Sequence, residues 1–154
     1  VVAITGSNGK TTTKDMVAAV LAQKYQTFKT PANFNNEIGL PFTILTMPET
    51  TEMLVLEMGM DRPGQLTFLS KLAQPDVAVI TMIGEAHLEF FKTRAKIAQA
   101  KLEITAGLKP GGLFLIPADE PLLQEAANLP SNTQSFGPEP AECVESLQET
   151  QFVD

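Results

Sequence analysis

An apolar segment that runs directly into a glycine-containing loop constrains the fold more than any other feature. Val1-Val2-Ala3-Ile4 precedes Gly6-Ser7-Asn8-Gly9-Lys10-Thr11-Thr12-Thr13, and an amphipathic stretch follows. A strand, a glycine loop and a helix in this order form a cradle in which backbone N–H groups bind phosphate oxygens, a lysine neutralises the outer phosphates and a threonine hydroxyl can bind Mg²⁺. We therefore expect nucleotide binding by Gly6, Ser7, Asn8, Gly9, Lys10, Thr11 and Thr12.

The spacing of this loop departs from the common Gly-x-x-x-x-Gly-Lys-Thr pattern, because Ile4 occupies the position of the first glycine. The alternative interpretation is an ordinary strand-to-helix turn that happens to contain lysine and threonine. The strand before it and the helix after it favour the phosphate cradle.

Composition limits the class of protein. The 154 residues are 44% hydrophobic and 19% charged, which is typical of one globular domain with a core. A formal charge of −7 without a basic stripe argues against nucleic-acid binding. The single cysteine, Cys143, excludes an internal disulfide and favours a reducing compartment. No apolar run reaches the ~20 residues of a membrane span. We therefore expect a cytoplasmic protein. The chain begins within a predicted strand without Met and ends in a strand-like stretch, so we expect it to be part of a longer polypeptide.

Apolar runs alternate with helix-length segments along the chain, which predicts an α/β fold. Each run lacks polar alternation, as strands buried on both faces do. The pattern predicts a mostly parallel sheet with helices on both faces and ligands beyond the carboxyl ends of its strands. The predicted strands are Val1–Ile4, Gln26–Lys29, Met53–Leu56, Val77–Ile80 and Leu113–Ile116; the predicted helices are Thr12–Gln26, Pro63–Leu72, Thr93–Ala106 and a helix from Asp119 to about Asn128. From Ser131 onward we expect a final strand, a turn, and an edge or antiparallel excursion.

Glu57 directly follows a predicted buried strand, at the same end of the sheet as the phosphate loop. A strand-end carboxylate there can complete the oxygen coordination of Mg²⁺ together with Thr11, phosphates and water. The alternative is a solvated glutamate.

His87 is the only histidine and follows the Val77 strand, so it also faces the expected ligand side. It is a candidate metal ligand and catalytic residue, flanked by Glu85 and Glu89, which could orient it or be solvated. The alternative is a surface histidine with an ordinary hydrogen bond.

Lys101 lies on the apolar stripe of its predicted helix, in line with Ile97, Ile104 and Leu108. Burial lowers the pKa of a lysine, and the neutral amine can pair with a carboxylate, act as a base, or add CO₂ to become a carbamate that binds metal ions. The alternative is an ammonium that reaches solvent at the edge of the stripe.

We expect the segment from Thr30 to Pro41 to form a polar loop after the second predicted strand, and asparagines gather in it. The amides of Asn33, Asn35 and Asn36 can donate and accept hydrogen bonds, which suits a sugar, a peptide or diphosphate oxygens. Asparagines also cap helices and form turns.

Taken together, these segments resemble the Mur ligases, the ATP-dependent amide-forming enzymes of bacterial cell-wall synthesis. Nearly the whole chain is similar to their central ATP-binding domain. The resemblance rests on the phosphate loop and on Asn33-Phe34-Asn35-Asn36-Glu37-Ile38-Gly39-Leu40-Pro41, Glu57-Met58-Gly59-Met60, Ile83-Gly84-Glu85-Ala86-His87-Leu88-Glu89 and Ala100-Lys101-Leu102-Glu103-Ile104.

The resemblance implies a ligase that adds D-alanyl-D-alanine to UDP-N-acetylmuramoyl-tripeptide, with ATP and two Mg²⁺ ions. It implies that Thr11 and Glu57 hold one ion, that His87 and a carbamylated Lys101 hold the other, and that Lys10 screens the phosphates. It also implies a three-domain enzyme in which residues 1–154 lack the N-terminal UDP-binding domain and the C-terminal domain. Pro117-Ala118-Asp119 stands where the family often has Asn-Ala-Asp, whose asparagine lies near adenine.

Two alternatives remain at this point. One is another amide ligase of the superfamily, of the folylpolyglutamate or tripeptide-forming type, against which the Asn33 to Pro41 segment argues. The other is a regulatory nucleotide-binding module without catalysis, against which Glu57, His87 and Lys101 argue.

Overall fold

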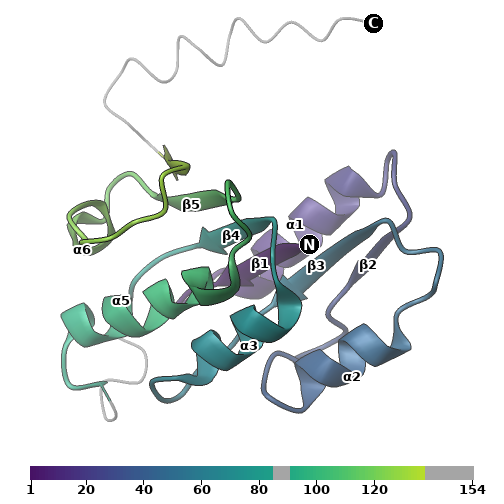
Figure 1. Ribbon diagram of the computed structural model, residues 1–154, viewed down its shortest axis with the longest axis horizontal. Coiled ribbons are helices and arrows are strands. Elements are labelled where there is room, and N and C mark those ends of the chain that lie inside the picture. Colours follow the sequence, from purple (N-terminus) through teal and green to yellow (C-terminus); the bar gives the residue numbers. More distant parts are fainter. Residues whose placement is uncertain (85–90, 138–154) are drawn as a thin grey trace, which may run out of the picture.

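A computed structural model describes residues 1–84 and 91–137 (Figure 1). Strands and helices alternate, as the sequence predicts. The strands are β1 (Val2–Thr5), β2 (Thr27–Lys29), β3 (Met53–Glu57), β4 (Val77–Ile80), β5 (Leu113–Pro117) and β6 (Thr133–Phe136). The helices are α1 (Lys10–Leu21), α2 (Gly39–Thr46), α3 (Gln65–Ala73), α5 (Arg94–Leu102) and α6 (Pro121–Gln124), and a 3₁₀ helix, η1 (Glu103–Gly107), continues α5.

The strands form one sheet in the order β2-β3-β1-β4-β5-β6, and every described pair is parallel. β1 lies in the middle, with Val2 in register with Val55 of β3 and Val77 of β4. The final strand β6 is an edge strand parallel to β5, which confirms the strand expected after Ser131. The excursion expected after this strand lies outside the described residues. All six carboxyl ends therefore meet at one edge of the sheet, where ligands of such folds bind.

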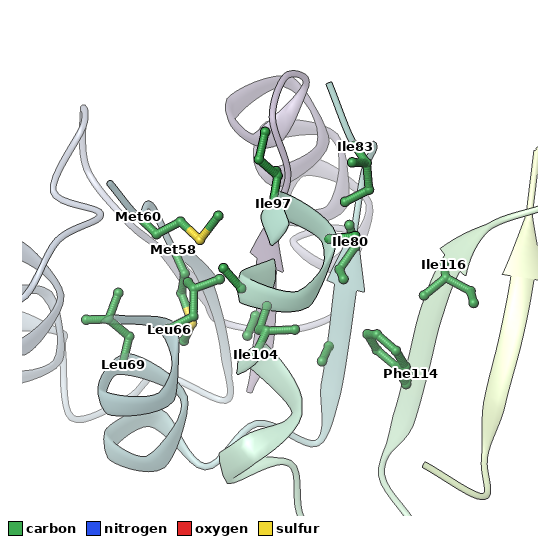
Figure 2. Packing of buried hydrophobic residues seen from close by; sticks show 14 of the residues in the cluster. Met58, Met60, Leu66, Leu69, Ile80, Ile83, Ile97, Ile104, Phe114 and Ile116 are labelled. Atoms are coloured by element: carbon green, nitrogen blue, oxygen red, sulfur yellow. The ribbon is translucent and has the colours of Figure 1, made fainter. Parts of the chain in front are cut away.

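Helices cover both faces of this sheet, as predicted. On one face Ile4, Val55 and Val79 pack against Ala18 of α1. On the other face α2, α3 and α5 lie in a row (Figure 1), and their apolar side chains meet those of the strands (Figure 2). Leu66, Leu69, Ile97 and Ile104 are at most 1% exposed there. The chain leaves β1 toward one face and β3 toward the other, which opens a crevice between the ends of these neighbouring strands.

Some predicted elements are wrong in extent. The segment around Gly39 was expected to be a loop, but it contains α2, which has apolar residues on all sides rather than a stripe. Helix α6 spans only four residues, and Glu120 caps it instead of Asp119, since its carboxylate accepts a hydrogen bond from the N–H of Leu122. In α1 the apolar Val17, Val20 and Leu21 fall at helical spacing, which predicts that they face the sheet, but Val20 is 71% exposed, because the fully buried positions of α1 are Lys14 and Ala18.

No helix in the described part of the chain is long and apolar enough to cross a membrane.

Candidate active site at the carboxyl edge of the sheet

The glycine loop between β1 and α1 is held closely against the end of β4. Gly6 has φ of 154°, and a Cβ there would lie 1.8 Å from Oγ1 of Thr81, so the close approach requires glycine. The N–H of Ser7 donates to the carbonyl of Met82 at 2.9 Å, and the hydroxyl of Thr81 donates to the carbonyl of Asn8 at 2.5 Å. Gly9 closes the loop in the left-handed region, with φ of 80°.

The first turn of α1 is open to an anion. Gly9 is its N-cap and supplies no side-chain hydrogen bond, and no acidic residue lies in the first turn. The N–H groups and the helix dipole at this end therefore favour a phosphate. The hydroxyl oxygen of Ser7 is also buried without a hydrogen-bond partner among the described residues. The ammonium of Lys10 lies over the loop and donates to the carbonyl of Gly6 at 2.9 Å.

Glu57 ends β3 beside this loop, as predicted, and its side chain is only 3% exposed. Its Oε2 accepts a hydrogen bond from the hydroxyl of Thr11 at 2.9 Å, and its Oε1 accepts one from the amide of Asn35 at 2.8 Å. The hydroxyl of Thr30 accepts a hydrogen bond from the N–H of Glu57 at 2.9 Å and fixes the end of the strand. A carboxylate and a hydroxyl, both hard oxygen ligands, thus lie together at the mouth of the phosphate loop.

These two oxygen ligands fit Mg²⁺ bound with a nucleotide. Mg²⁺ takes six oxygen ligands and commonly keeps several waters and phosphate oxygens, so one or two protein ligands suffice. Within residues 1–84 and 91–137, no group of three or more histidine, cysteine, aspartate and glutamate side chains could hold a metal by itself. His87, the other predicted ligand, and its neighbours Glu85 and Glu89 lie outside the described residues.

The three asparagines of the predicted substrate segment have different environments. Asn35 holds Glu57, and its carbonyl accepts a hydrogen bond from the N–H of Gly59 at 2.7 Å. Asn36 caps α2, because its Oδ1 accepts hydrogen bonds from the N–H groups of Ile38 and Gly39. Asn33 is exposed. A cavity of about 300 Å³ beside Lys10 is lined by Asn35, Asn36 and the residues after β3.

Lys101 is buried in α5, as its position on the apolar stripe predicts. Its side chain is 3% exposed, and neighbours on both sides, Ile97 and Ile104, are at most 1% exposed. Burial lowers the pKa of Lys101 to about 7, and the positive charge of Lys10 acts in the same direction. Burial therefore favours the neutral amine of Lys101 far more than solvent favours it for an exposed lysine.

A second cavity, of about 490 Å³, adjoins the loop at the carboxyl ends of β4, β5 and β6. Thr81, Pro117 and Phe136 line it. Arg94 fixes one wall, because its guanidinium donates to the carbonyl of Ile83 at 3.0 Å and to the carboxylate of Glu120 at 2.6 Å.

Sequence reasoning missed several of these side chains. Lys14 lies beside Glu57, and its position one turn after Lys10 on α1 could have revealed it. The contacts of Thr30, Asn35 and Arg94 join segments far apart in the sequence, and no local pattern indicates them.

The sequence of the chain matches a known protein family. Residues 4–152 match the model of the Mur ligase middle domain. The chain belongs to the Mur ligase family. The resemblance inferred from the motifs is thereby confirmed, as is the fold class.

Two relatives with similar sequences are ligases of the same name. The chain is 56% identical over 137 residues to the UDP-N-acetylmuramoyl-tripeptide–D-alanyl-D-alanine ligase of Bacillus subtilis, covering 89% of this chain and 30% of the relative. The ligase of the same name from Mycobacterium tuberculosis is 40% identical over 129 residues, covering 84% of this chain and 25% of the relative. The chain thus spans about a third or less of the length of these Mur ligases.

Solved Mur ligase structures share the fold. MurF from Thermotoga maritima in complex with ADP superposes with a TM-score of 0.79 at 44% identity, over 88% of this chain and 31% of that one. MurF from Acinetobacter baumannii superposes with a TM-score of 0.80 at 34% identity, over 88% and 30% of the two chains.

Proposed function

We propose that this chain is the nucleotide-binding part of a ligase that joins D-alanyl-D-alanine to UDP-N-acetylmuramoyl-tripeptide. The 2.9 Å contact between Thr11 and Glu57, beside Lys10 and the open end of α1, carries the proposal. It brings together what a metal-bound triphosphate needs: a hydroxyl, a carboxylate, an ammonium and helix N–H groups without a side-chain cap. The two substrates in this proposal are those in the names of the similar ligases.

The proposed reaction activates a carboxylate. The tripeptide carboxylate attacks the γ-phosphorus of ATP, the bond to the β-phosphate oxygen breaks, and an acyl phosphate and ADP form. The amine of D-alanyl-D-alanine then attacks the acyl carbon, and phosphate leaves. Lys10 stabilises the charge on the outer phosphates, and the glycine loop orients them. Thr11 and Glu57 would hold Mg²⁺, which would supply charge stabilisation at the transferred phosphoryl group.

Lys101 is proposed to work as a carbamate, with His87, at a second Mg²⁺. The support for this role is the buried position of the amine and its pKa of about 7, because only the neutral amine adds CO₂. The product carries carboxylate oxygens, which suit Mg²⁺.

The remaining cavities suggest places for the other substrate groups. The cavity beside Lys10, with Asn35 and Asn36 in its wall, is proposed for the reacting end of the peptide substrate, and Asn33 for a further contact with it. The cavity lined by Thr81 and Pro117 is proposed for the base of the nucleotide. Because the relatives are about three times longer, we propose that domains outside residues 1–154 hold the UDP moiety and close the site. We propose that the reaction takes place in the cytoplasm, where ATP is present.

The experiment uses the intact protein with ATP, UDP-N-acetylmuramoyl-tripeptide and D-alanyl-D-alanine, and measures the amide product and phosphate. Glu57→Gln should lower kcat/KM by at least a hundredfold, since the isosteric amide cannot supply the charge that Mg²⁺ requires. Glu52→Gln is the matched control at the opposite end of β3, where Glu52 binds the backbone N–H of Gln26. Full activity of Glu57→Gln, or no amide product from the unsubstituted protein, would contradict the proposal.

The carbamate has a test of its own. Lys101→Ala should lose activity, and short carboxylic acids should restore part of it by filling the space of the carbamate. An unmodified Lys101 in crystals grown with bicarbonate and nucleotide near neutral pH would remove this part of the proposal.

A further inference from the structure

Lys14 is a buried cation that the proposed reaction does not use. It lies on α1 one turn after Lys10, and its side chain is 3% exposed. Its ammonium lies 3.7 Å from Oε2 of Glu57 and 3.7 Å from Oδ1 of Asp15. A buried ammonium is costly without such partners, so its place beside Glu57 is fixed by charge as well as by packing.

Asp15 holds Lys14 from the solvent side. The carboxylate of Asp15 is half exposed and also binds the ammonium of Lys29 at 2.8 Å. Lys14 is therefore shared between a buried carboxylate and a surface carboxylate, whereas Lys29, which is 47% exposed, contacts only the surface one among the described residues. The two lysines pair with the same acid and differ in their distance from the candidate metal ligand.

Without a nucleotide, the charge around Glu57 is unfavourable for a divalent cation. Glu57 is a single carboxylate, and it already faces the ammonium of Lys14 and accepts two neutral hydrogen bonds. Lys10 adds a further positive charge at the loop. Because the side chains of Lys14 and Glu57 are buried, the ammonium of Lys14 and a metal ion at Glu57 would repel each other strongly. The negative charges of bound phosphate groups would offset this repulsion.

We propose that Lys14 is a positioning residue that balances the charge of Glu57 and makes metal binding depend on the nucleotide phosphates. The inference rests on the proposed nucleotide site and adds an order to it: the metal ion enters with the nucleotide and does not bind stably before it. Lys14 also keeps the carboxylate turned toward Thr11, the second candidate ligand.

The test measures the binding of Mn²⁺ to the intact protein at pH 8 by electron paramagnetic resonance, with and without saturating ADP. The ratio of the two dissociation constants is the coupling factor between metal and nucleotide. In Lys14→Met, Mn²⁺ should bind at least tenfold more tightly without ADP, and the coupling factor should fall at least tenfold. A residue needed only for folding would weaken binding under both conditions and leave the ratio unchanged.

Three variants sharpen the result. Lys29→Met, the matched control, should change the coupling factor by less than twofold, and Lys14→Arg should retain it because the charge remains. Asp15→Asn removes the half-exposed carboxylate that Lys14 and Lys29 share and should raise the coupling factor, since Lys14 then faces the charge of Glu57 alone. It decides the question if Lys14→Met does not fold. An unchanged coupling factor in Lys14→Met or in Asp15→Asn overturns the inference, whereas failure of the unsubstituted protein to bind Mn²⁺ with ADP overturns the nucleotide site as well.

Discussion

Replacing Lys101 with methionine should stabilise the fold, and the gain should depend on pH. Burial lowers the pKa of Lys101 from 10.5 to about 7, so a protonated Lys101 is less stable in the folded protein than in the unfolded chain. A shift of this size corresponds to about 5 kcal/mol when both states are protonated, which holds below pH 7. Methionine keeps the length of the side chain and removes the charge.

The sign of the pH dependence follows from proton binding. Between pH 7 and 10.5 the unfolded chain binds more protons at Lys101 than the folded protein does, so the free energy of unfolding of the unsubstituted chain rises with pH. The Lys101→Met variant lacks this contribution. The difference in free energy of unfolding should be about 5 kcal/mol at pH 6 and should shrink by about 1.4 kcal/mol for each pH unit above 7.

The assay is urea unfolding of this 154-residue chain at pH 6, 7, 8 and 9, in buffers free of CO₂ so that no carbamate forms. Lys96→Met is the matched control, because Lys96 lies on the same helix and is exposed; it should change the free energy of unfolding by less than about 0.5 kcal/mol at every pH. A difference for Lys101→Met that stays constant from pH 6 to 9 would refute the reasoning. It would mean that the ammonium finds solvent or a partner.

Three further substitutions test the fold around the site. Gly6→Ala should destabilise the protein by at least about 2 kcal/mol in urea unfolding, because its Cβ would collide with Thr81; Gly64→Ala is the comparison, since it shares a positive φ but meets nothing within 4 Å. Arg94→Ala should cost about 1–3 kcal/mol in the same assay by leaving the buried carboxylate of Glu120 without its ion pair, and a change below about 0.5 kcal/mol would show that the pair contributes little. Leu40→Ala should cost about 2–5 kcal/mol because Leu40 is the fully buried leucine of α2, and a smaller loss would mean that α2 is loosely attached.

The parts of the site that were predictable are those with a local signal. Three features could be predicted because a residue type coincides with the hydrophobic pattern of a single strand or helix: the glycine loop, Glu57 at a strand end and Lys101 on an apolar stripe. Because the sheet is parallel, the strand ends that carry the loop and Glu57 lie at the same edge. Helix α2 was missed because its residues are apolar on all sides, and a helix of that kind has no amphipathic period.

The contacts between distant segments were not predictable in the same way. Asn35 and Thr30 reach Glu57 from a segment that periodicity describes only as polar. Lys14 has one local signal, its position one turn after Lys10, but a lysine on a helix is usually solvated, and the buried carboxylate opposite it comes from a distant strand.

The central position of β1 bears on how the chain folds as it leaves the ribosome. Val2 is in register with Val55 and Val77, so β1, which precedes the other described strands in the chain, has no described neighbour until β3 and β4 have been synthesised. At about 5–20 residues per second, the nascent segment from β1 through α1 waits several seconds for them, and such distant parallel pairing is slow to form. The apolar run of β1 is exposed during that interval, which makes it a candidate binding segment for chaperones acting on nascent chains, and the phosphate loop takes its shape only when Thr81 and Met82 arrive to hold it.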